Sequence, residues 1–194
     1  MRVLDKGLWL WTGLEDESER RRVISEHLAG LVGCPAEELV VERDTLGRPF
    51  IARPQTDLQF SQARRDGFVV LAASEQGAVG VDVDLLQPGD WQGKLAGDFF
   101  APKEKRWLDS LAEEDRTFGF FRLWTGKEAV LKALGLGIAQ GMAEPDFSKI
   151  IALRQSFLEN SAQLSARGKL FHLEWWSLEI DAISIVVCKA TQDS

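Results

Sequence analysis

Hydrophobic residues recur along this chain at two spacings, the three-to-four-residue spacing of helices and the two-residue alternation of strands. The first spacing predicts helices at residues 16–33, 94–100, 102–115 and 117–134. Asp16 or Ser18 suits the start of the first of these helices, Gly33 suits its end, and Pro102 suits the start of the third. The second spacing predicts strands at residues 7–11, 171–180 and 182–190.

Shorter elements are predicted between these segments. Residues 68–86 divide into two strands around SEQG, which predicts a hairpin. Residues 34–44 predict a short helix followed by a strand, and residues 45–51 predict a turn that leads into an extended segment.

Two segments rich in glycine interrupt the pattern. Residues 87–93 have the composition of a linker, and residues 134–145 predict a glycine-rich loop. Helices and strands lie on both sides of the linker. We therefore expect an α+β fold with two packed subdomains, residues 1–87 and 88–194.

Composition narrows the class of protein. A chain of 194 residues, 45% of them hydrophobic, is long enough to bury a proper core. Its formal net charge of −7 argues against a general nucleic-acid binder. The apolar run near the N-terminus is too short for a signal peptide or a membrane span, so we expect no membrane association. The two cysteines, Cys34 and Cys188, form no disulfide or zinc pattern, which favours the cytoplasm.

The predicted helix at residues 117–134 carries an unusual set of charges. At about 100° per residue, its apolar face has Lys127 near the middle, where a lysine needs an anion as partner. Glu128 and Lys132 lie along one edge of this face, four residues apart. An ordinary helix-surface ion pair accounts for Glu128 and Lys132, but it does not account for Lys127.

A pair of carboxylates lies on the strand predicted in GAVGVDVDLL. Its valines face one way, whereas Asp82 and Asp84 face the other, with Cα atoms about 6.5–7 Å apart. A solvated strand face is one interpretation. The other is an oxygen site for Mg²⁺ that Glu128 completes, because such sites use a few carboxylates, waters and substrate phosphate oxygens. The two histidines of the chain leave little scope for a histidine triad or a multi-histidine metal site.

Together these two segments resemble the 4′-phosphopantetheinyl transferase family, and the Sfp type fits best by length. GVDVDLL is similar to the family pattern G-(I/V)-D-(I/V)-E, and LWTGKEAVLKALGLGI to W-x-x-K-E-A-x-x-K, some forty residues later. FFAPKEKRWL and LGRPFI resemble two further family segments. The likeness covers roughly residues 32–190.

The resemblance implies a concrete function. The family has two similar α+β halves, packed with pseudo-two-fold symmetry around an active site, and moves phosphopantetheine from coenzyme A to a serine of an acyl or peptidyl carrier protein. Asp82, Asp84 and Glu128 would hold Mg²⁺. Lys127 and Lys132 would bind phosphate, and Glu128 or a metal-bound water would take the serine proton. Asp82, Glu128 and Lys132 would thus be the catalytic residues, and a monomer would suffice.

The chain departs from the family pattern at several positions, among them Asp84, which replaces the commoner glutamate. LQFSQARRDG keeps Ser61, which the resemblance implies contacts coenzyme A together with Gln62, but Gln62 stands where the family has a histidine of the coenzyme A phosphate site. Glutamine can donate a hydrogen bond but carries no charge. Arg64 and Arg65 follow and would supply the lost charge, or else they form a solvated turn. Arg48, in the G-R-P turn, is a further candidate for binding phosphate.

Two other basic segments have two interpretations each. Residues 18–22, SERRR, replace a longer basic stretch of the family and either contact coenzyme A or face solvent. A carrier protein that is acidic around its serine requires a basic docking face. Such a face is formed by Lys94, Lys103, Lys105 and Arg106, unless these residues belong to a helix surface of mixed charge.

Two rival functions follow from the same residues. A degenerate homologue would bind carrier protein or coenzyme A without transfer, as the altered segment around Gln62 suggests. A Mg²⁺-dependent phosphohydrolase would also use paired aspartates, but the sequence contains no separate nucleophile motif. The retained acids and helix lysines favour the transferase.

Overall fold

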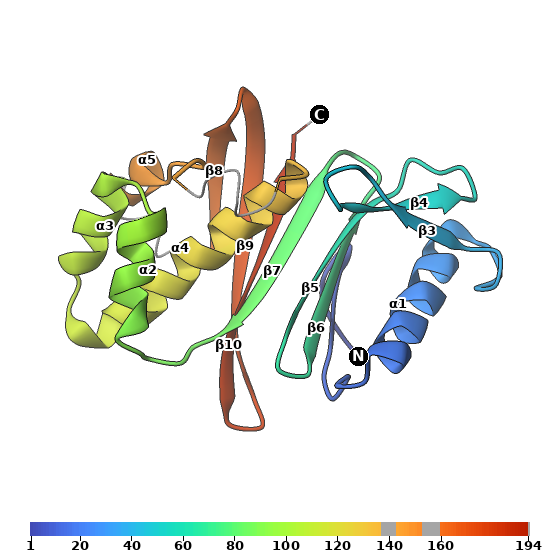
Figure 1. The fold of residues 1–194 in the computed structure, drawn as a ribbon, viewed down its shortest axis with the longest axis horizontal. Helices are drawn as coiled ribbons and strands as arrows, with labels where there is room; N and C mark the ends of the chain where they lie inside the picture. The colour runs from blue at the N-terminus through green and yellow to red at the C-terminus, as the bar shows by residue number, and fades with distance from the viewer. Residues whose placement is uncertain (137–142, 153–159, 194) are drawn as a thin grey trace.

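A computed structural model describes residues 1–136, 143–152 and 160–193. In these residues, two four-stranded antiparallel sheets each have a helix packed on one face, which confirms the predicted α+β class (Figure 1). The glycine-rich loop predicted at residues 134–145 lies partly outside the described residues.

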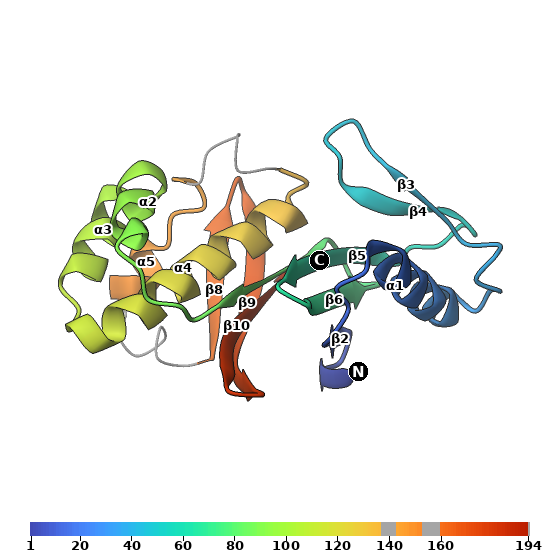
Figure 2. The same ribbon diagram turned by 60° about the horizontal axis from the view of Figure 1, so that its bottom comes forward.

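The N-terminal half contains the sheet β1-β2-β6-β5. Its strands are β1 (Arg2–Asp5), β2 (Leu8–Trp11), β5 (Gln59–Arg65) and β6 (Phe68–Ser74). Helix α1 (Glu17–Val32) packs on this sheet, because Ile24 and Leu28 share a core cluster with Phe60, Val69 and Leu71. A separate hairpin of β3 (Val40–Arg43) and β4 (Pro49–Arg53) lies beside α1 (Figure 2).

The C-terminal half contains the sheet β7-β10-β9-β8. Its strands are β7 (Val79–Leu85), β8 (Ser161–Ala166), β9 (Lys169–Ile180) and β10 (Ile183–Gln192). The long helix α4 (Glu113–Ala133) lies across one face of this sheet (Figures 1 and 2). The shorter helices are α2 (Trp91–Phe99), α3 (Pro102–Asp109) and α5 (Ser148–Ala152), and they lie on the side of α4 away from the N-terminal half (Figure 1).

The hairpin predicted at residues 68–86 is wrong, although both of its strands exist. β6 is hydrogen-bonded to β2 on one side and to β5 on the other, so neither of its edges is free for β7. β7 instead pairs with β10 in the second sheet, with Asp82 opposite Cys188. β7 therefore belongs to the C-terminal sheet although it precedes residue 87. The division at residue 87 and the pseudo-two-fold symmetry remain predictions.

Capping residues and a proline correctly predicted where two of the helices begin or end. Asp16 caps α1, accepting a hydrogen bond from the backbone N–H of Glu19, and Gly33 ends the helix in the left-handed conformation. Pro102 begins α3 as predicted. The short helix predicted after residue 34 is wrong, because only a turn forms before β3 begins at Val40. No helix among the described residues combines the length and the apolar character needed to cross a membrane.

Candidate active site

The two aspartates of β7 lie on the face of the strand opposite to its valine residues. The residues of the opposite face are buried in one cluster with side chains of β2, β6 and β10: Val79, Val81, Val83 and Leu85. Asp82 is buried and Asp84 is partly buried. The predicted alternation of the strand is therefore confirmed, and the valine face anchors the carboxylates.

Gly80 lets helix α4 approach β7 closely. A Cβ atom at this position would lie 1.9 Å from the carbonyl oxygen of Ala129 and 2.6 Å from the backbone nitrogen of Ala133. Both distances are shorter than any real contact, so only glycine fits without a shift of the helix. The glycine that precedes the two aspartates thus sets the distance between α4 and the strand that carries them.

This close packing brings Glu128 into the electrostatic field of both aspartates. The pKa of Glu128 is raised to about 7, mainly by burial and also by the negative charges of Asp82 and Asp84, while Lys132 opposes the shift. An elevated pKa of this kind marks a carboxylate that is shielded from water and has like charges nearby. The expectation that Glu128 joins the two aspartates as a metal ligand stays a prediction.

Lys132 pairs with the first aspartate. Its ammonium nitrogen lies 2.8 Å from Asp82 Oδ1 and 3.1 Å from the carbonyl oxygen of Val81. Burial still raises the pKa of Asp82, although Lys132 opposes the shift. Because its side chain is 29% exposed, Lys132 can also reach a ligand in solution.

Arg65 pairs with the second aspartate. This residue ends β5 in the N-terminal half, and its Nε lies 3.1 Å from Asp84 Oδ1. Burial raises the pKa of Asp84, and Arg65 opposes this shift. The acid cluster, which we define as Asp82, Asp84 and Glu128, thus receives one cation from each half of the chain.

The donor chemistry of the acid cluster fits Mg²⁺. Carboxylate oxygens are the ligands that this ion prefers, usually with several waters and substrate phosphates completing its shell. Burial and the two aspartates raise the pKa of Glu128, and a cation bound at the cluster would lower it again. Among the described residues, however, no group of three or more His, Cys, Asp or Glu side chains is placed so as to hold a metal ion. The two aspartates are instead turned toward Lys132 and Arg65.

Lys127 does not face the region between the two halves, so its predicted role with phosphate is wrong. Its ammonium nitrogen lies 2.8 Å from Glu104 Oε1 of helix α3 and 2.6 Å from the carbonyl oxygen of Pro145. The rings of Phe100 and Phe147 flank it. The sequence correctly required an anion for Lys127, but that anion is a buried glutamate of the chain itself.

Two of the predicted coenzyme A residues connect the halves near the acid cluster. Ser61 is buried, and its Oγ accepts a hydrogen bond from the backbone N–H of Val81, 3.2 Å away, so that β5 is held against β7. Arg48 is partly buried and donates a hydrogen bond to the carbonyl oxygen of Ala133 at the end of α4. Burial lowers the pKa of Arg48 from its usual value. Both residues therefore already have partners in the protein.

Gln62 and Arg64 belong to a different surface. They are exposed and line a cavity of about 550 Å³, which α1 and the β3–β4 hairpin complete with Arg20, Arg21 and Arg43. Its apolar wall includes Ile24, Leu28, Leu39, Phe60 and Val69. The structure thus separates the predicted coenzyme A residues into two groups. It also places part of the SERRR segment beside Gln62, which the sequence alone did not reveal.

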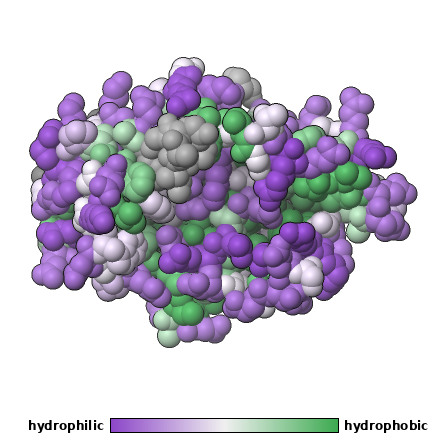
Figure 3. Space-filling model, viewed as in Figure 1, coloured by the Kyte–Doolittle hydropathy of each residue, from purple (hydrophilic) through white to green (hydrophobic). Residues whose placement is uncertain are grey.

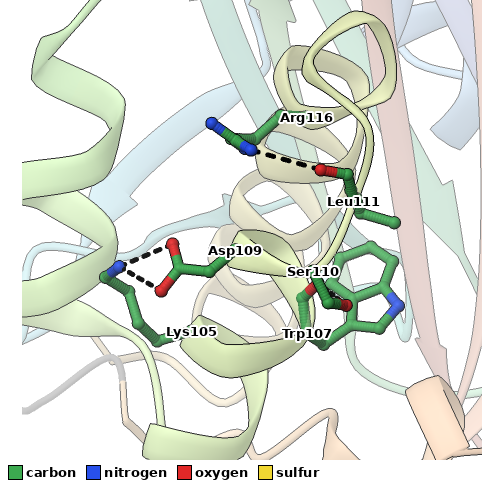
Figure 4. Close-up of polar contacts among 6 residues, drawn as sticks. All are labelled: Lys105, Trp107, Asp109, Ser110, Leu111 and Arg116. Atoms are coloured by element: carbon green, nitrogen blue, oxygen red, sulfur yellow. Dashed lines mark hydrogen bonds and ion pairs between the residues drawn. The ribbon is translucent and has the colours of Figure 1, made fainter.

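The proposed docking face on α3 contains at least one internal ion pair. Lys105 contacts both carboxylate oxygens of Asp109, at 2.6 and 2.7 Å (Figure 4). After the last turn of α3, Ser110 donates a hydrogen bond to the carbonyl oxygen of Trp107, and Arg116 donates one to that of Leu111 (Figure 4). The interpretation of α3 as a mixed-charge helix surface therefore holds for Lys105. The docking role of the other basic residues stays a prediction.

The β3–β4 hairpin carries an exposed apolar surface that the sequence did not predict. Val41, Leu46 and Phe50 are 40%, 60% and 40% exposed, and the same region forms a hydrophobic patch in the space-filling view (Figure 3). The alternation of β3 and β4 gives no warning of this, because exposed and core-facing apolar residues look alike in a short strand.

Comparisons with known proteins place this arrangement in a family. The model of the 4′-phosphopantetheinyl transferase superfamily matches residues 78–188, which include the acid cluster and Lys132. A putative 4′-phosphopantetheinyl transferase of Synechocystis is 37% identical over 116 residues, 59% of this chain and 47% of that protein. The 4′-phosphopantetheinyl transferase gsp of Aneurinibacillus migulanus is 33% identical over 116 residues, 60% of this chain and 46% of that protein.

A third relative, the 4′-phosphopantetheinyl transferase HetI of Nostoc, is 31% identical over 122 residues, 62% of this chain and 52% of that protein. The chain therefore spans about half the length of the curated relatives it matches. The family model leaves Arg48, Ser61, Gln62, Arg64 and Arg65 outside the matched region, so their roles rest on the structure of this chain. Matched over more than half its length and at the motifs that form the acid cluster, the chain belongs to the 4′-phosphopantetheinyl transferase superfamily.

Proposed function

We propose that this chain transfers 4′-phosphopantetheine from coenzyme A to a serine of an acyl or peptidyl carrier protein, and that the transfer depends on Mg²⁺. The observation that supports the proposal is the electrostatic interaction of Glu128 with the two aspartates of β7, on a helix that Gly80 allows to approach this strand closely. All four residues lie in the region that matches the family. The relatives named above carry the same activity in their names.

Asp82, Asp84 and Glu128 are the proposed ligands of Mg²⁺. When bound, Mg²⁺ supplies Lewis-acid stabilisation of the negative charge that builds up on the pyrophosphate of coenzyme A. Before the ion binds, Lys132 and Arg65 neutralise the two aspartates. Lys132 is partly exposed and is the residue we propose to bind a phosphate of coenzyme A once Asp82 has another partner.

Glu128 is the proposed proton acceptor. In the reaction, the serine Oγ of the carrier forms a bond to the phosphorus of the phosphopantetheine group. The bond from this phosphorus to 3′,5′-ADP breaks, and the serine proton moves to a base. A base works best when its pKa lies near the working pH. Burial raises the pKa of Glu128 to about 7 and so brings it nearer to this condition than an ordinary surface carboxylate, although a bound Mg²⁺ would lower that pKa again.

We further propose that one chain carries out the reaction, in the cytoplasm, with coenzyme A and a carrier protein as partners. One chain suffices, because both halves contribute cations to the acid cluster, Lys132 from α4 and Arg65 from β5. We place the reaction in the cytoplasm, in keeping with two free cysteines. Coenzyme A and an acidic carrier protein are the expected partners, and we propose no role for nucleic acid or membrane.

An intact-mass assay tests the proposal against its rivals. The protein is incubated with coenzyme A, Mg²⁺ and each of a panel of apo carrier proteins. A mass gain of one phosphopantetheine on a carrier supports the transferase. Binding of coenzyme A or carrier without any mass gain supports a degenerate homologue, and release of free phosphate or hydrolysed coenzyme A supports a phosphohydrolase. A phosphopantetheinyl transferase of established activity, run on the same carriers, verifies that they accept the group.

A further inference from the structure

Arg65 occupies a position at the acid cluster that a divalent cation would contest. Its Nε lies 3.1 Å from Asp84 Oδ1. We propose that Arg65 is the resident counter-ion of Asp84, which a divalent cation must displace, so that this residue sets the metal affinity of the site. The inference rests on the proposed function, because it takes the acid cluster to be the metal site.

Charge balance explains why Arg65 and a divalent cation compete for the acid cluster. Three carboxylates face two neighbouring cations, Lys132 on Asp82 and Arg65 on Asp84. A divalent cation at the cluster would be repelled by a guanidinium a few ångströms away, because like charges at such distances interact strongly where water is partly excluded. Arg65 must therefore withdraw from Asp84 for the metal to bind well.

The geometry allows Arg65 to withdraw and keeps Asp84 in place. The side chain of Arg65 is 47% exposed, whereas that of Asp84 is 14% exposed. Asp84 Oδ1 also accepts a hydrogen bond from the backbone N–H of Leu85, 2.8 Å away. A rotation of the arginine side chain alone would thus break the pair.

A second acid is available to receive the arginine. Asp66, the next residue along the chain, has its Oδ2 3.6 Å from the Nε of Arg65 and a side chain that is 66% exposed. The guanidinium can therefore exchange one carboxylate for another without leaving the protein surface. The exchange uses the turn after β5, and it leaves the sheets unchanged.

The neighbouring arginine supplies a matched control. Arg64 carries the same charge one residue earlier on β5 and lines the cavity beside α1 together with Gln62. Both arginines border a smaller hollow of about 340 Å³ near Arg20, so the two substitutions remove the same charge close to each other. Arg65 is the one whose guanidinium forms an ion pair with Asp84.

Titration with Mn²⁺, followed by the paramagnetic resonance signal of the free ion, measures metal affinity without any transfer reaction. Arg65→Gln should bind Mn²⁺ about two- to five-fold more tightly than the unmodified chain, the effect expected when one partly exposed ion pair is removed. Arg64→Gln removes the same charge and should leave the affinity unchanged. Equal tightening in both variants, or none in Arg65→Gln, would overturn the proposal.

A double-mutant cycle tests the exchange itself. Asp66→Asn removes the alternative partner of Arg65, and asparagine tolerates the positive φ of 42° at position 66. It should weaken Mn²⁺ binding about two-fold in the presence of Arg65 and clearly less in the Arg65→Gln variant, where only the direct charge of Asp66 near Asp84 is lost. The same effect in both backgrounds would show that Asp66 acts by its own charge, and would overturn the exchange.

These outcomes separate the inference from the proposed function. If Arg65→Gln leaves the Mn²⁺ affinity unchanged while the unmodified chain modifies a carrier, only the role of Arg65 is overturned. Tighter Mn²⁺ binding by Arg65→Gln without carrier modification supports that role and overturns the transferase. The absence of Mn²⁺ binding in every variant overturns both the role of Arg65 and the metal site.

Discussion

The ammonium nitrogen of Lys127 lies 2.8 Å from a carboxylate oxygen of Glu104, and neither side chain reaches the solvent. Glu104 also accepts hydrogen bonds from the backbone N–H groups of Ala101 and Phe147. Burial lowers the pKa of Lys127 and raises that of Glu104, and the ion pair opposes both shifts. The pair therefore joins α3 to α4 and to the segment before α5.

Lys127→Met should destabilise the protein by about 3–5 kcal/mol, because it leaves the Glu104 carboxylate buried without its cation. Chemical denaturation measures this loss. The double variant Lys127→Met, Glu104→Gln should recover part of it. Lys103→Met, the same change at an exposed position of α3, should alter the free energy of unfolding by less than about 0.5 kcal/mol.

If Lys127→Met kept its stability but bound coenzyme A more weakly, Lys127 would face the ligand after all. The interpretation of this residue from the sequence alone would then be correct, and the buried pair would have no structural role.

Gly80→Ala should destabilise the protein and reduce carrier modification together, because an added Cβ would meet the backbone of Ala129 and force α4 away from β7. Thermal unfolding and the intact-mass assay measure the two effects. Gly97→Ala in α2 is the control, since nothing lies within 4 Å of its added Cβ and alanine favours a helix. An unchanged melting temperature for Gly80→Ala would mean that the helix does not need the close approach.

The raised pKa of Glu128 predicts how the free energy of unfolding depends on pH. Its pKa rises from 4.5 in the unfolded chain to about 7 in the folded one, so the folded state holds more protons between these values. The free energy of unfolding should therefore fall as pH increases from about 4.5 to 7. Burial raises the pKa of Asp82 and Asp84 as well, which adds to the same trend.

Mg²⁺ should oppose this loss because it binds the deprotonated carboxylates. We expect it to raise the melting temperature more at about pH 8 than at about pH 5.5. Glu128→Gln should flatten the pH dependence and reduce the Mg²⁺ effect, whereas Glu114→Gln, at an exposed position on the same helix, should change neither. A Mg²⁺ effect of equal size at both pH values would argue against Glu128 as a ligand.

Arg64 is the residue of the cavity beside α1 that we expect to bind the 3′-phosphate of coenzyme A, because it follows Gln62 on β5. Arg64→Ala should weaken the binding of coenzyme A more than that of dephospho-coenzyme A, because Arg64 lines this cavity with Gln62. Binding should also be sensitive to salt, since the arginine is exposed. Calorimetry with the two ligands makes the comparison.

Arg22→Ala is the matched control for this arginine, because Arg22 is exposed on α1 and paired with Glu26 outside the cavity. Equal weakening of both ligands by Arg64→Ala would place the 3′-phosphate elsewhere. Gln62→His should be tolerated and should bind coenzyme A more tightly below about pH 6.5, where histidine is protonated.

The sequence predicted those parts of the site that depend on local pattern. The alternation of residues 79–85 correctly separated the valine face from Asp82 and Asp84. The four-residue spacing placed Glu128 and Lys132 on one edge of α4, and Lys132 does contact Asp82.

Long-range contacts could not be predicted in the same way. The partner of Lys127 is 23 positions away on another helix, and the hydrophobic pattern contains nothing that connects the two. β7 leaves the sheet of its neighbour β6 because both edges of β6 are already paired, which only the three-dimensional arrangement reveals. Arg64 and Arg65 are adjacent in sequence, yet Arg65 contacts Asp84 and Arg64 lines the cavity with Gln62.

The mass of an apo carrier protein after incubation with coenzyme A and Mg²⁺ tests the proposed transfer most directly. We predict a gain of one phosphopantetheine with the unmodified chain, and none with Glu128→Gln or when a chelator removes the metal. The activity should persist in Glu114→Gln, which carries the same substitution outside the acid cluster. An unmodified carrier in the presence of folded protein, when a phosphopantetheinyl transferase of established activity modifies the same preparation, would contradict the proposed transfer.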